Sequence, residues 1–577
     1  MTYHSLRDRE PGTLRQSAPV RRPPTHRVDP RIAVAGAVAV VAVVVGALIA
    51  FSGPGVGGRT GAAGSSPSPS RSPVAAAGAS IAPTAGPSVA PAASVAPGPA
   101  VGEAATFPLA LVARNTDLRT GFTSAQVGAL LRGGKVILPC GLSEVTIDGA
   151  AVRLPDAICT PADEVATGLA KTKAGLALLP PGLVDPRVKV LTVDDADLFG
   201  NTVARARPYP LAGRSDALPS EMAGTATVYD ANDVRTVVST GDTCPDRSVS
   251  NWAVVRGKGW DSTLKGGTVK YAGTYMDRRY DGPTGSGWPV VKATRTGEDA
   301  GALWSMIHDA DLAVNDFECP LIRGFTQHDS GTFFTIDPKV AGLMKRVGMD
   351  VLSLASNHIT DLGGDGVAQT VDILDKAGVQ HAGAGENLAA AMKPAVVDVR
   401  GLKFAILSWD ATGQSTSATA SRAGALKPTP NNLKKSIAKA RAQADIVIAM
   451  PQWNWPEYSA PFSKVALAQR DAWFDAGVDH ILGSGTHWAS AISVTEPDPA
   501  KGWRLAVTSH GNFLFGQDWS RQTQEGIVYA ATFYGTRLAQ VRLHPYFVMD
   551  SAQPSLTDPR TDGAFVLKQV YRVSDLP

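Results

Sequence analysis

The sequence predicts an α/β protein, most of which is exported across a membrane. Three observations lead to this expectation. From about residue 234 to the C-terminus, short β-branched apolar runs alternate with helical patterns of about 10 to 16 residues, which is typical of α/β architecture. Hydrophobic residues make up 44% of the chain and charged residues 19%, which is enough apolar material for a sizeable core. A long apolar stretch follows a basic N-terminus.

The charge of the chain is nearly balanced, with 55 Lys and Arg against 52 Asp and Glu, a formal net charge of +3. The surplus lies in the basic, cytoplasmic tail of residues 1–31, where seven Arg face Asp8, Glu10 and Asp29. That local +4 leaves about −1 for the remaining residues. We therefore expect no nucleic acid among the partners of this protein.

Residues 32–51 are twenty consecutive residues without a charge or a strongly polar group. A helix of this length spans about 30 Å, the thickness of the hydrocarbon layer, whereas a cleavable signal has an apolar region of about 7 to 15 residues. The arginines before the stretch favour a cytoplasmic N-terminus. We expect a transmembrane signal anchor in the cell membrane, single-pass, with the bulk extracytoplasmic. A cleaved signal with a long apolar region is the alternative, and it also exports the remainder.

Residues 52–105 are almost entirely Ala, Ser, Pro, Gly, Val and Thr, without an aromatic residue. This composition cannot form a core and predicts a disordered linker. Residues 106–222 then contain short apolar runs between turn residues, which predicts a small α/β accessory domain. Its expected strands are 108–113, 135–138 and 188–192, and its expected helix is 123–131, capped by Thr123 or Ser124.

The four cysteines all lie on the exported side, where disulfides are permitted. Four cysteines allow three pairings. We favour Cys140 with Cys159 and Cys244 with Cys319, because each pair falls within one predicted domain. A zinc site is disfavoured, since no short Cys-x-x-Cys spacing occurs.

The second domain, residues 234–577, has predicted strands that end in polar residues. The strands are 234–239, 312–315, 351–354, 404–409, 446–450, 480–482 and 505–509. The polar residues that follow them are Asp242, Asp316, Glu318, Asn357, His358, Asp410, Gln452, Glu457, His487, His510 and Asn512. Each of these alone is better explained by a helix cap, a turn or, for a His, a structural role.

The carboxyl ends of parallel strands meet at one edge of an α/β sheet, so these side chains are expected to share one cleft. Oxygen donors mixed with imidazoles suit divalent Mn, Fe, Mg or Zn, and two such ions can hold a phosphoryl oxygen while activating water. The pattern therefore predicts a metal-assisted hydrolase.

The same residues resemble a known family. The blocks Gly241-Asp242 with Arg247, Asp316 to Leu321, Leu354 to Asp361, Gly383 to Gly385 and Gly511 to Phe515 look like those of the CapA family of capsule (poly-γ-glutamate) synthesis proteins. The resemblance covers about residues 234 to 550. It implies a calcineurin-like metallophosphoesterase sandwich, two sheets flanked by helices, in a membrane-anchored protein. It also implies work on an extracellular envelope polymer, with other capsule-synthesis subunits as further partners.

The resemblance and the polar strand ends together indicate a metal-ligand set on this chain and catalytic roles for two of its residues. Asp242 and His358 are the catalytic candidates, with His358 as general acid for the leaving oxygen. The expected metal ligands are Asp242, Asp316, Glu318, Asn357, His358 and His487. The cleft is expected to be lined by Arg247, Gln452, Glu457, His510, Asn512, Trp453 and Trp488. The two Trp could stack on polymer or fill the core, and both readings stay open.

The sequence departs from the family pattern at three positions. Asp316 stands where the family block has Asn, Gln452 replaces a His, and Gly485 replaces the first His of a pair whose second is His487. Fewer imidazoles and more oxygen donors favour Mn or Mg over Zn, with His510 as an expected compensating imidazole. The alternative function is a non-catalytic polymer-binding or assembly protein on the same fold.

Overall fold

The protein is described here from a computed structural model, which covers residues 97–577 except for 155–158, 172–174, 280–285, 298–299, 332, 454–455 and 497–501. The predicted tail, the predicted anchor at 32–51 and the predicted linker up to residue 96 lie outside the described residues. Within the part that is described, no helix combines the length and the apolar character that a membrane crossing requires.

Within its described residues, the first domain contains three small sheets and three α-helices. Its sheets have the strand orders β1-β9-β4-β5, β6-β2-β7 and β3-β8. The strands are β1 (Ala105–Pro108), β2 (Ala110–Arg114), β3 (Gly121–Phe122), β4 (Glu144–Ile147), β5 (Ala150–Ala151), β6 (Ala177–Leu179), β7 (Val188–Val190), β8 (Thr192–Val193) and β9 (Leu211–Ser215). The helices are α2 (Ser124–Arg132), α3 (Ala162–Ala170) and α4 (Thr202–Arg205).

Local signals in this domain act largely as the sequence predicts. Thr123 caps α2, and Gln126 completes a capping box by accepting from the Thr123 backbone N–H. The run 135–138 is an exception, because only Ile137 makes an isolated bridge, to Ala177. Cys140 is bonded to Cys159.

The second domain is built on two large sheets. One has the order β15-β14-β13-β10-β25-β26-β27, with β24 also paired to β10, and the other has the order β17-β18-β20-β21-β23-β22. The first sheet contains β10 (Val234–Thr243), β13 (Leu312–Phe317), β14 (Val351–Ser353), β15 (Gln380–Ala382), β24 (Asn512–Leu514), β25 (Glu525–Tyr534), β26 (Arg537–Met549) and β27 (Gln553–Leu556). The second contains β17 (Ala395–Val399), β18 (Leu402–Asp410), β20 (Ile446–Gln452), β21 (His480–Leu482), β22 (Ile492–Thr495) and β23 (Arg504–Val507).

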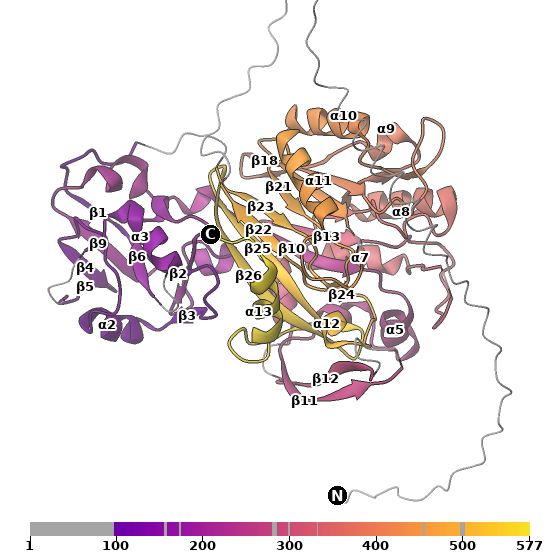
Figure 1. The fold of residues 1–577 in the computed structure, drawn as a ribbon, viewed down its shortest axis with the longest axis horizontal. Helices are drawn as coiled ribbons and strands as arrows, with labels where there is room; N and C mark the ends of the chain where they lie inside the picture. Colours follow the sequence, from indigo (N-terminus) through magenta and orange to yellow (C-terminus); the bar gives the residue numbers. More distant parts are fainter. Residues whose placement is uncertain are drawn as a thin grey trace, which may run out of the picture. The chain divides into compact units, whose positions relative to one another are not determined.

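The two sheets pack face to face, and helices cover their outer faces (Figure 1). One apolar cluster joins inward side chains such as Val314 of β13 and Ile448 of β20. Alternate residues of the same strands point outward, because side chains in a strand alternate between the two faces. Outside the first sheet lie α6 (Ala302–His308), α7 (Lys339–Val347) and α8 (Gly363–Ala377); outside the second lie α9 (Leu388–Ala391), α10 (Pro430–Arg441) and α11 (Lys464–Asp475).

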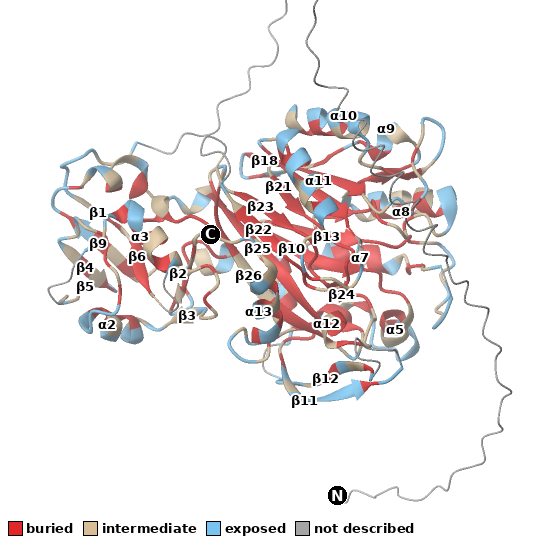
Figure 2. Ribbon diagram, in the orientation of Figure 1, coloured by how far each residue is buried: buried red, intermediate tan, exposed pale blue. Residues whose placement is uncertain are grey.

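The central strands of this domain are buried along their whole length, whereas the helices expose one side (Figure 2). This accounts for the uninterrupted apolar character of the strand sequences, since both faces of each sheet are covered. All seven strands expected from the sequence are present, within a few residues of their expected bounds.

Several smaller elements complete the described part of the domain. A hairpin of β11 (Val269–Asp277) and β12 (Trp288–Arg295) stands at its edge, and β16 (Ala384–Gly385) pairs with β19 (Gly424–Ala425). The short helices are α5 (Arg247–Ser250) and α12 (Arg521–Gln524), and α13 (Ala564–Val573) packs near the C-terminus. Cys244 is bonded to Cys319, which ties the loop after β10 to the loop after β13.

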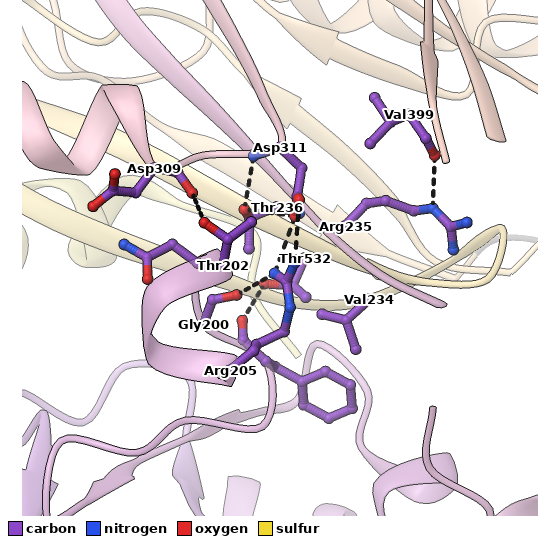
Figure 3. A network of polar contacts seen from close by, with 12 residues as sticks. Gly200, Thr202, Arg205, Val234, Arg235, Thr236, Asp309, Asp311, Val399 and Thr532 are labelled. Carbon is purple, nitrogen blue, oxygen red and sulfur yellow. Dashed lines mark hydrogen bonds and ion pairs between the residues drawn. The ribbon is translucent and has the colours of Figure 1, made fainter. Parts of the chain in front are cut away.

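The first domain packs against the second through both apolar and polar contacts. Val234, Tyr534 and Ala539 of the second domain belong to an apolar cluster with residues of the first. The polar part centres on the buried carboxylate of Asp311, which pairs with Arg205 of α4 at 3.0 Å and accepts from the Thr236 backbone N–H at 2.7 Å (Figure 3). The two domains are therefore joined by a buried ion pair as well as by a core.

Candidate metal centre

The carboxyl ends of strands from both sheets meet and bring the predicted polar residues together. β10, β13 and β14 run parallel in one sheet, and β18, β20 and β21 run parallel in the other. Asp242 lies in β10, Glu318 follows β13, and His487 lies in the loop after β21. Residues far apart in the sequence thus share one site because of strand order.

Asp242, Glu318 and His487 form the heart of the site. Each offers one ligand atom within 4.8 Å of the others, and all three residues are buried. The distance from His487 Nδ1 to Asp242 Oδ2 is 3.0 Å, and Nδ1 lies 2.9 Å from Asn512 Oδ1. The backbone N–H of Gly485 donates to Asp242 Oδ1 at 3.1 Å. We call these three residues the triad.

The electrostatics of the site are those of crowded, buried acids. Burial, together with the charge of Asp242, raises the pKa of Asp316 and of Glu318 well above their ordinary values. Burial alone would lower the pKa of His487, but the hydrogen bond and charge of Asp242 outweigh it and raise this pKa to about 9. Several acids packed together without solvent are costly unless a cation compensates them.

The residues present fit a divalent cation. Both carboxylate oxygens of Asp316 and Oε2 of Glu318 are buried without a hydrogen-bond partner. Unpaired buried oxygens are rare in proteins, and a metal ion is one of the few groups that explains them. A donor set of carboxylates with a single imidazole in the triad suits hard ions such as Mn and Mg better than Zn.

The amide of Gln452 lies inside the site, where the family pattern has a histidine. Its Nε2 donates to Glu318 Oε1 at 3.1 Å and to Asn357 Oδ1 at 3.2 Å, and its Oε1 accepts from Ser484 Oγ at 2.8 Å. Gly485 has φ +98°, and a Cβ there would lie 2.8 Å from Gln452 Nε2. The two departures are therefore coupled, because the amide of one occupies the space that a side chain at the other needs.

Among the described residues, the group of candidate metal ligands contains neither of two predicted histidines. His358 Nδ1 lies 3.0 Å from Asp361 Oδ2, and its ring packs on Phe334 at 4.6 Å. His510 is 1% exposed, and its Nδ1 donates to the Gly483 carbonyl at 2.9 Å. Burial lowers the pKa of His510 to about 4. His510 lies outside the group of candidate ligands, but its Nε2 is buried without a hydrogen-bond partner, so its role as a compensating imidazole stays a prediction.

Trp453 fills the core, one of its two expected places, and does not line the cleft. It stacks on Trp473 at 5.1 Å and donates to Gln469 Oε1, within the core outside the second sheet. The strand before it turns this side chain toward the helices, which sequence alone does not determine. Trp488, by contrast, is half-buried and packs edge-on against Trp288.

The remaining predicted residues lie around the triad. The charge of the exposed Glu457 contributes to the raised pKa of His487, and Asn512 holds His487 as described above. Arg247 lies over the ring of Phe334 at 4.1 Å. Asp410, another polar strand end, is instead paired with Lys427 and has a structural role.

Several aromatic residues at the site escaped the sequence argument. Tyr458 packs on His487 at 5.6 Å and Phe515 packs on it at 5.1 Å. Phe515 ends the Gly511 to Phe515 block, and Tyr458 lies six residues after Gln452, which stands at a family histidine position. Their position within motif blocks was the available signal, since an aromatic residue by itself reads as core.

Comparison with known proteins identifies this domain. Residues 236–517 match the family described as bacterial capsule synthesis protein. The second domain belongs to the CapA family. The CapA-family domain is similar to a capsule biosynthesis protein CapA of Bacillus anthracis, 29% identical over 231 residues that cover 38% of this chain and 54% of the relative.

Two further proteins with related names are also similar to this chain. A PGA biosynthesis protein CapA of Bacillus subtilis (strain 168) is 28% identical over 223 residues, 38% of this chain and 57% of the relative. A protein named as a probable polyglutamine synthesis accessory protein of Mycobacterium tuberculosis (strain ATCC 25618 / H37Rv) is 31% identical over 163 residues, 26% of this chain and 42% of the relative. The chain thus spans about half the length of the curated relatives it matches. The triad residues all fall within the matched range.

Proposed function

We propose that the CapA-family domain holds a divalent metal ion and acts as a phosphoesterase-like hydrolase in the biosynthesis of poly-γ-glutamate or a related envelope polymer. One observation carries the proposal. The triad and Asp316 form a buried acidic cluster whose unpaired oxygens and single imidazole match a hard cation. The choice of polymer is inferred from the names of the relatives.

The residues of this chain have separate roles in the proposed reaction. Asp242, Glu318, Asp316 and His487 would hold the metal, which when bound supplies Lewis acidity and lowers the pKa of water. Asn512 and Gln452 orient these ligands through the hydrogen bonds given above. Asp361 orients His358 through Nδ1, which leaves Nε2 to give a proton to the leaving oxygen.

The test measures metal content and turnover on the full chain. After dialysis against Mn²⁺, the unmutated chain is expected to retain metal and to hydrolyse 4-nitrophenyl phosphate. Asp242→Asn and Glu318→Gln are expected to lose both properties. His358→Asn is expected to keep the metal and lose about 10²-fold or more in turnover. The control, Asp471→Asn, changes an acid that is exposed and pairs with Arg470; a native chain that takes up no metal would refute the proposal.

A second function is favoured by the amide of Gln452. Its hydrogen bonds to Glu318 Oε1 and Asn357 Oδ1 engage two oxygens that a metal would otherwise use. On this alternative the domain binds or assembles polymer without cleaving it. Retention of polymer by the metal-free chain, together with no turnover in any divalent metal, would select this function.

We infer further that both domains work outside the cytoplasm, anchored by residues 32–51. The two disulfides support this location, because disulfides persist in oxidising compartments. Protease added to intact cells is expected to degrade the two domains. Protection of both domains until the cells are lysed would contradict the inference.

A further inference from the structure

A pocket of about 550 Å³ lies beside the candidate metal centre. It is formed by segments that are distant in sequence, namely the start of α5, the hairpin strand β12, the loop after β20 and the loop after β24. Its lining residues are Arg247, Trp288, Tyr458, Gly516, Gln517, Asp518 and Trp519. We call it the aromatic pocket.

The aromatic pocket is continuous with the triad. Tyr458 contributes to the pocket and packs on His487 at 5.6 Å. Gln517, another lining residue, accepts from Asn512 Nδ2 at 3.3 Å, and Asn512 in turn holds His487. A ligand in the pocket would therefore extend directly from the metal centre.

Three rings form the apolar wall of the pocket. Trp519 meets Trp288 at 5.3 Å and Tyr458 at 4.8 Å, both edge to face. All three residues are half-buried, so part of each ring remains open to solvent. Partly exposed aromatic residues gathered in one hollow are typical of binding sites, because such rings provide contact area at low entropic cost.

Two buried donors at the pocket have no acceptor. These are Nε of Arg247 and Nε1 of Trp488, the latter on the residue that packs against Trp288. The terminal Nη2 of Arg247 donates to the Gly331 carbonyl, and among the described residues no carboxylate forms an ion pair with this guanidinium. Asp518, the one acid in the lining, already accepts from Arg279 and from Ser551. The pocket thus offers cationic and N–H donors that await a negatively charged acceptor.

The backbone supports a binding role for the same residues. Arg247 and Tyr458 have φ +46° and +53°, left-handed values that non-glycine residues seldom adopt. Strained backbone of this kind concentrates at ligand sites, where the surrounding structure maintains it.

We propose that the aromatic pocket binds an anionic oligomer with carboxylate groups spaced by methylene groups. Arg247 takes a carboxylate, while Trp288, Tyr458 and Trp519 pack against the methylene groups between carboxylates. The hydroxyl oxygens of an uncharged glycan would accept from these donors but would leave the charge of Arg247 without a counter-charge, so the acidic chain fits better. The inference rests on the proposed function only in that the bound chain leads toward the triad.

Binding of a γ-linked tetraglutamate to the full chain, measured by calorimetry with and without Mn²⁺, tests the proposal. Trp519→Ala and Arg247→Gln are expected to weaken binding about tenfold or more. Tyr275→Ala is the matched control, because Tyr275 is 46% exposed on β11 of the same hairpin and lies outside the pocket. It is expected to change affinity less than twofold.

Glu318→Gln separates this proposal from the proposed function. It is expected to abolish metal uptake while the metal-free affinity for tetraglutamate stays within twofold of the native chain. If the native chain takes up no metal but binds tetraglutamate, the metal site is refuted and the pocket assignment stands. Three outcomes would overturn the pocket assignment. In the first, the native chain fails to bind tetraglutamate at millimolar concentration, and in the second, both pocket variants bind it as tightly as the native chain does. The third outcome is a neutral tetrasaccharide that binds tighter than tetraglutamate and whose binding Arg247→Gln does not weaken.

Discussion

At the scale of single residues, the site shows how a lost histidine is replaced by a network rather than by another ligand. Gln452 fills the space beside Gly485 and connects Glu318, Asn357 and Ser484. Because Gly485 also donates its N–H to Asp242, its backbone conformation is part of the site. A glycine is required there both for its φ and for the close approach of the amide.

Gly485→Ala is expected to lower the free energy of unfolding by about 1–3 kcal/mol, because the residue has φ +98° and its Cβ would meet Gln452. Urea unfolding measures this, and metal affinity should fall with it. Gly401→Ala is the control, since Gly401 has φ +86° but nothing within 4 Å of a Cβ. Equal costs for the two variants would show that the contact with Gln452 does not matter.

At the scale of elements, the ends of β10 and β13 must keep a fixed spacing for the triad to exist. Cys244 lies two residues after Asp242, and Cys319 directly follows Glu318, so their disulfide joins the two ligand-bearing strand ends. It closes a separation of 75 residues and thereby restricts the unfolded chain.

Replacing Cys244 and Cys319 by Ser is expected to cost about 2–4 kcal/mol of unfolding free energy and to weaken metal binding. The matched control replaces Cys140 and Cys159 by Ser, which removes the disulfide of the first domain. That variant should lose stability but keep the metal affinity of the native chain. Calorimetric unfolding and metal titration give the two readouts; unchanged metal affinity without the Cys244–Cys319 bond would contradict the positioning role.

The start of β25 carries a buried acid that makes stability depend on pH. Glu525 is 1% exposed, and it accepts from Tyr271 Oη at 2.6 Å and Arg521 Nε at 3.0 Å. Burial raises the pKa of Glu525 to about 7 from its ordinary value of 4.5. The folded state therefore favours the protonated form more than the unfolded state does.

Because the folded pKa is the higher one, this stabilisation is complete below about pH 4.5 and is lost as the pH rises through about 7. Glu525→Gln is expected to flatten the decline in melting temperature between pH 5 and 8. Between these pH values, the free energy of unfolding of the native chain is expected to change relative to the variant by at most about 3 kcal/mol. Parallel pH profiles for the native chain and the variant would show that Glu525 does not titrate in this range.

At the scale of the whole molecule, the first domain and the CapA-family domain share a polar junction as well as a core. Burial would raise the pKa of Asp311, but hydrogen bonds from Arg400 and Arg205 outweigh it and hold the pKa below its ordinary value. Arg205 belongs to the first domain, and Arg400 follows β17 of the second. One carboxylate therefore connects three segments.

Asp311→Asn is expected to cost about 3–5 kcal/mol, because it leaves the buried guanidinium of Arg205, and that of the partly exposed Arg400, without their shared negative charge. Limited proteolysis should then cut between the two domains. Asp195→Asn, which breaks an exposed pair with Arg207 at 3.8 Å, is the control and should change little. Resistance of the Asp311 variant to proteolysis would indicate that the apolar contacts alone hold the domains.

Expectations that rest on interactions between residues close in the sequence were more accurate than those that rest on contacts between distant residues. The strands of the second domain, the capped helix α2 and the polar strand ends depend on neighbours in the chain, and the structure has them. Contacts between residues of the two sheets were harder to predict from the sequence. Asp410 looked like Asp242 in sequence, yet it pairs with Lys427, whereas Asp242 faces His487.

The sequence by itself determined the α/β alternation, the positions of polar groups at strand ends and the motif blocks of a CapA-family domain. It did so because hydrophobic periodicity and turn chemistry are local properties. Only the tertiary structure decided which polar groups meet, that His510 and Trp453 face the interior, and that three aromatic rings from separate segments surround one pocket. Those outcomes depend on strand order and on which face each side chain takes, and both are set when the two sheets pack against each other.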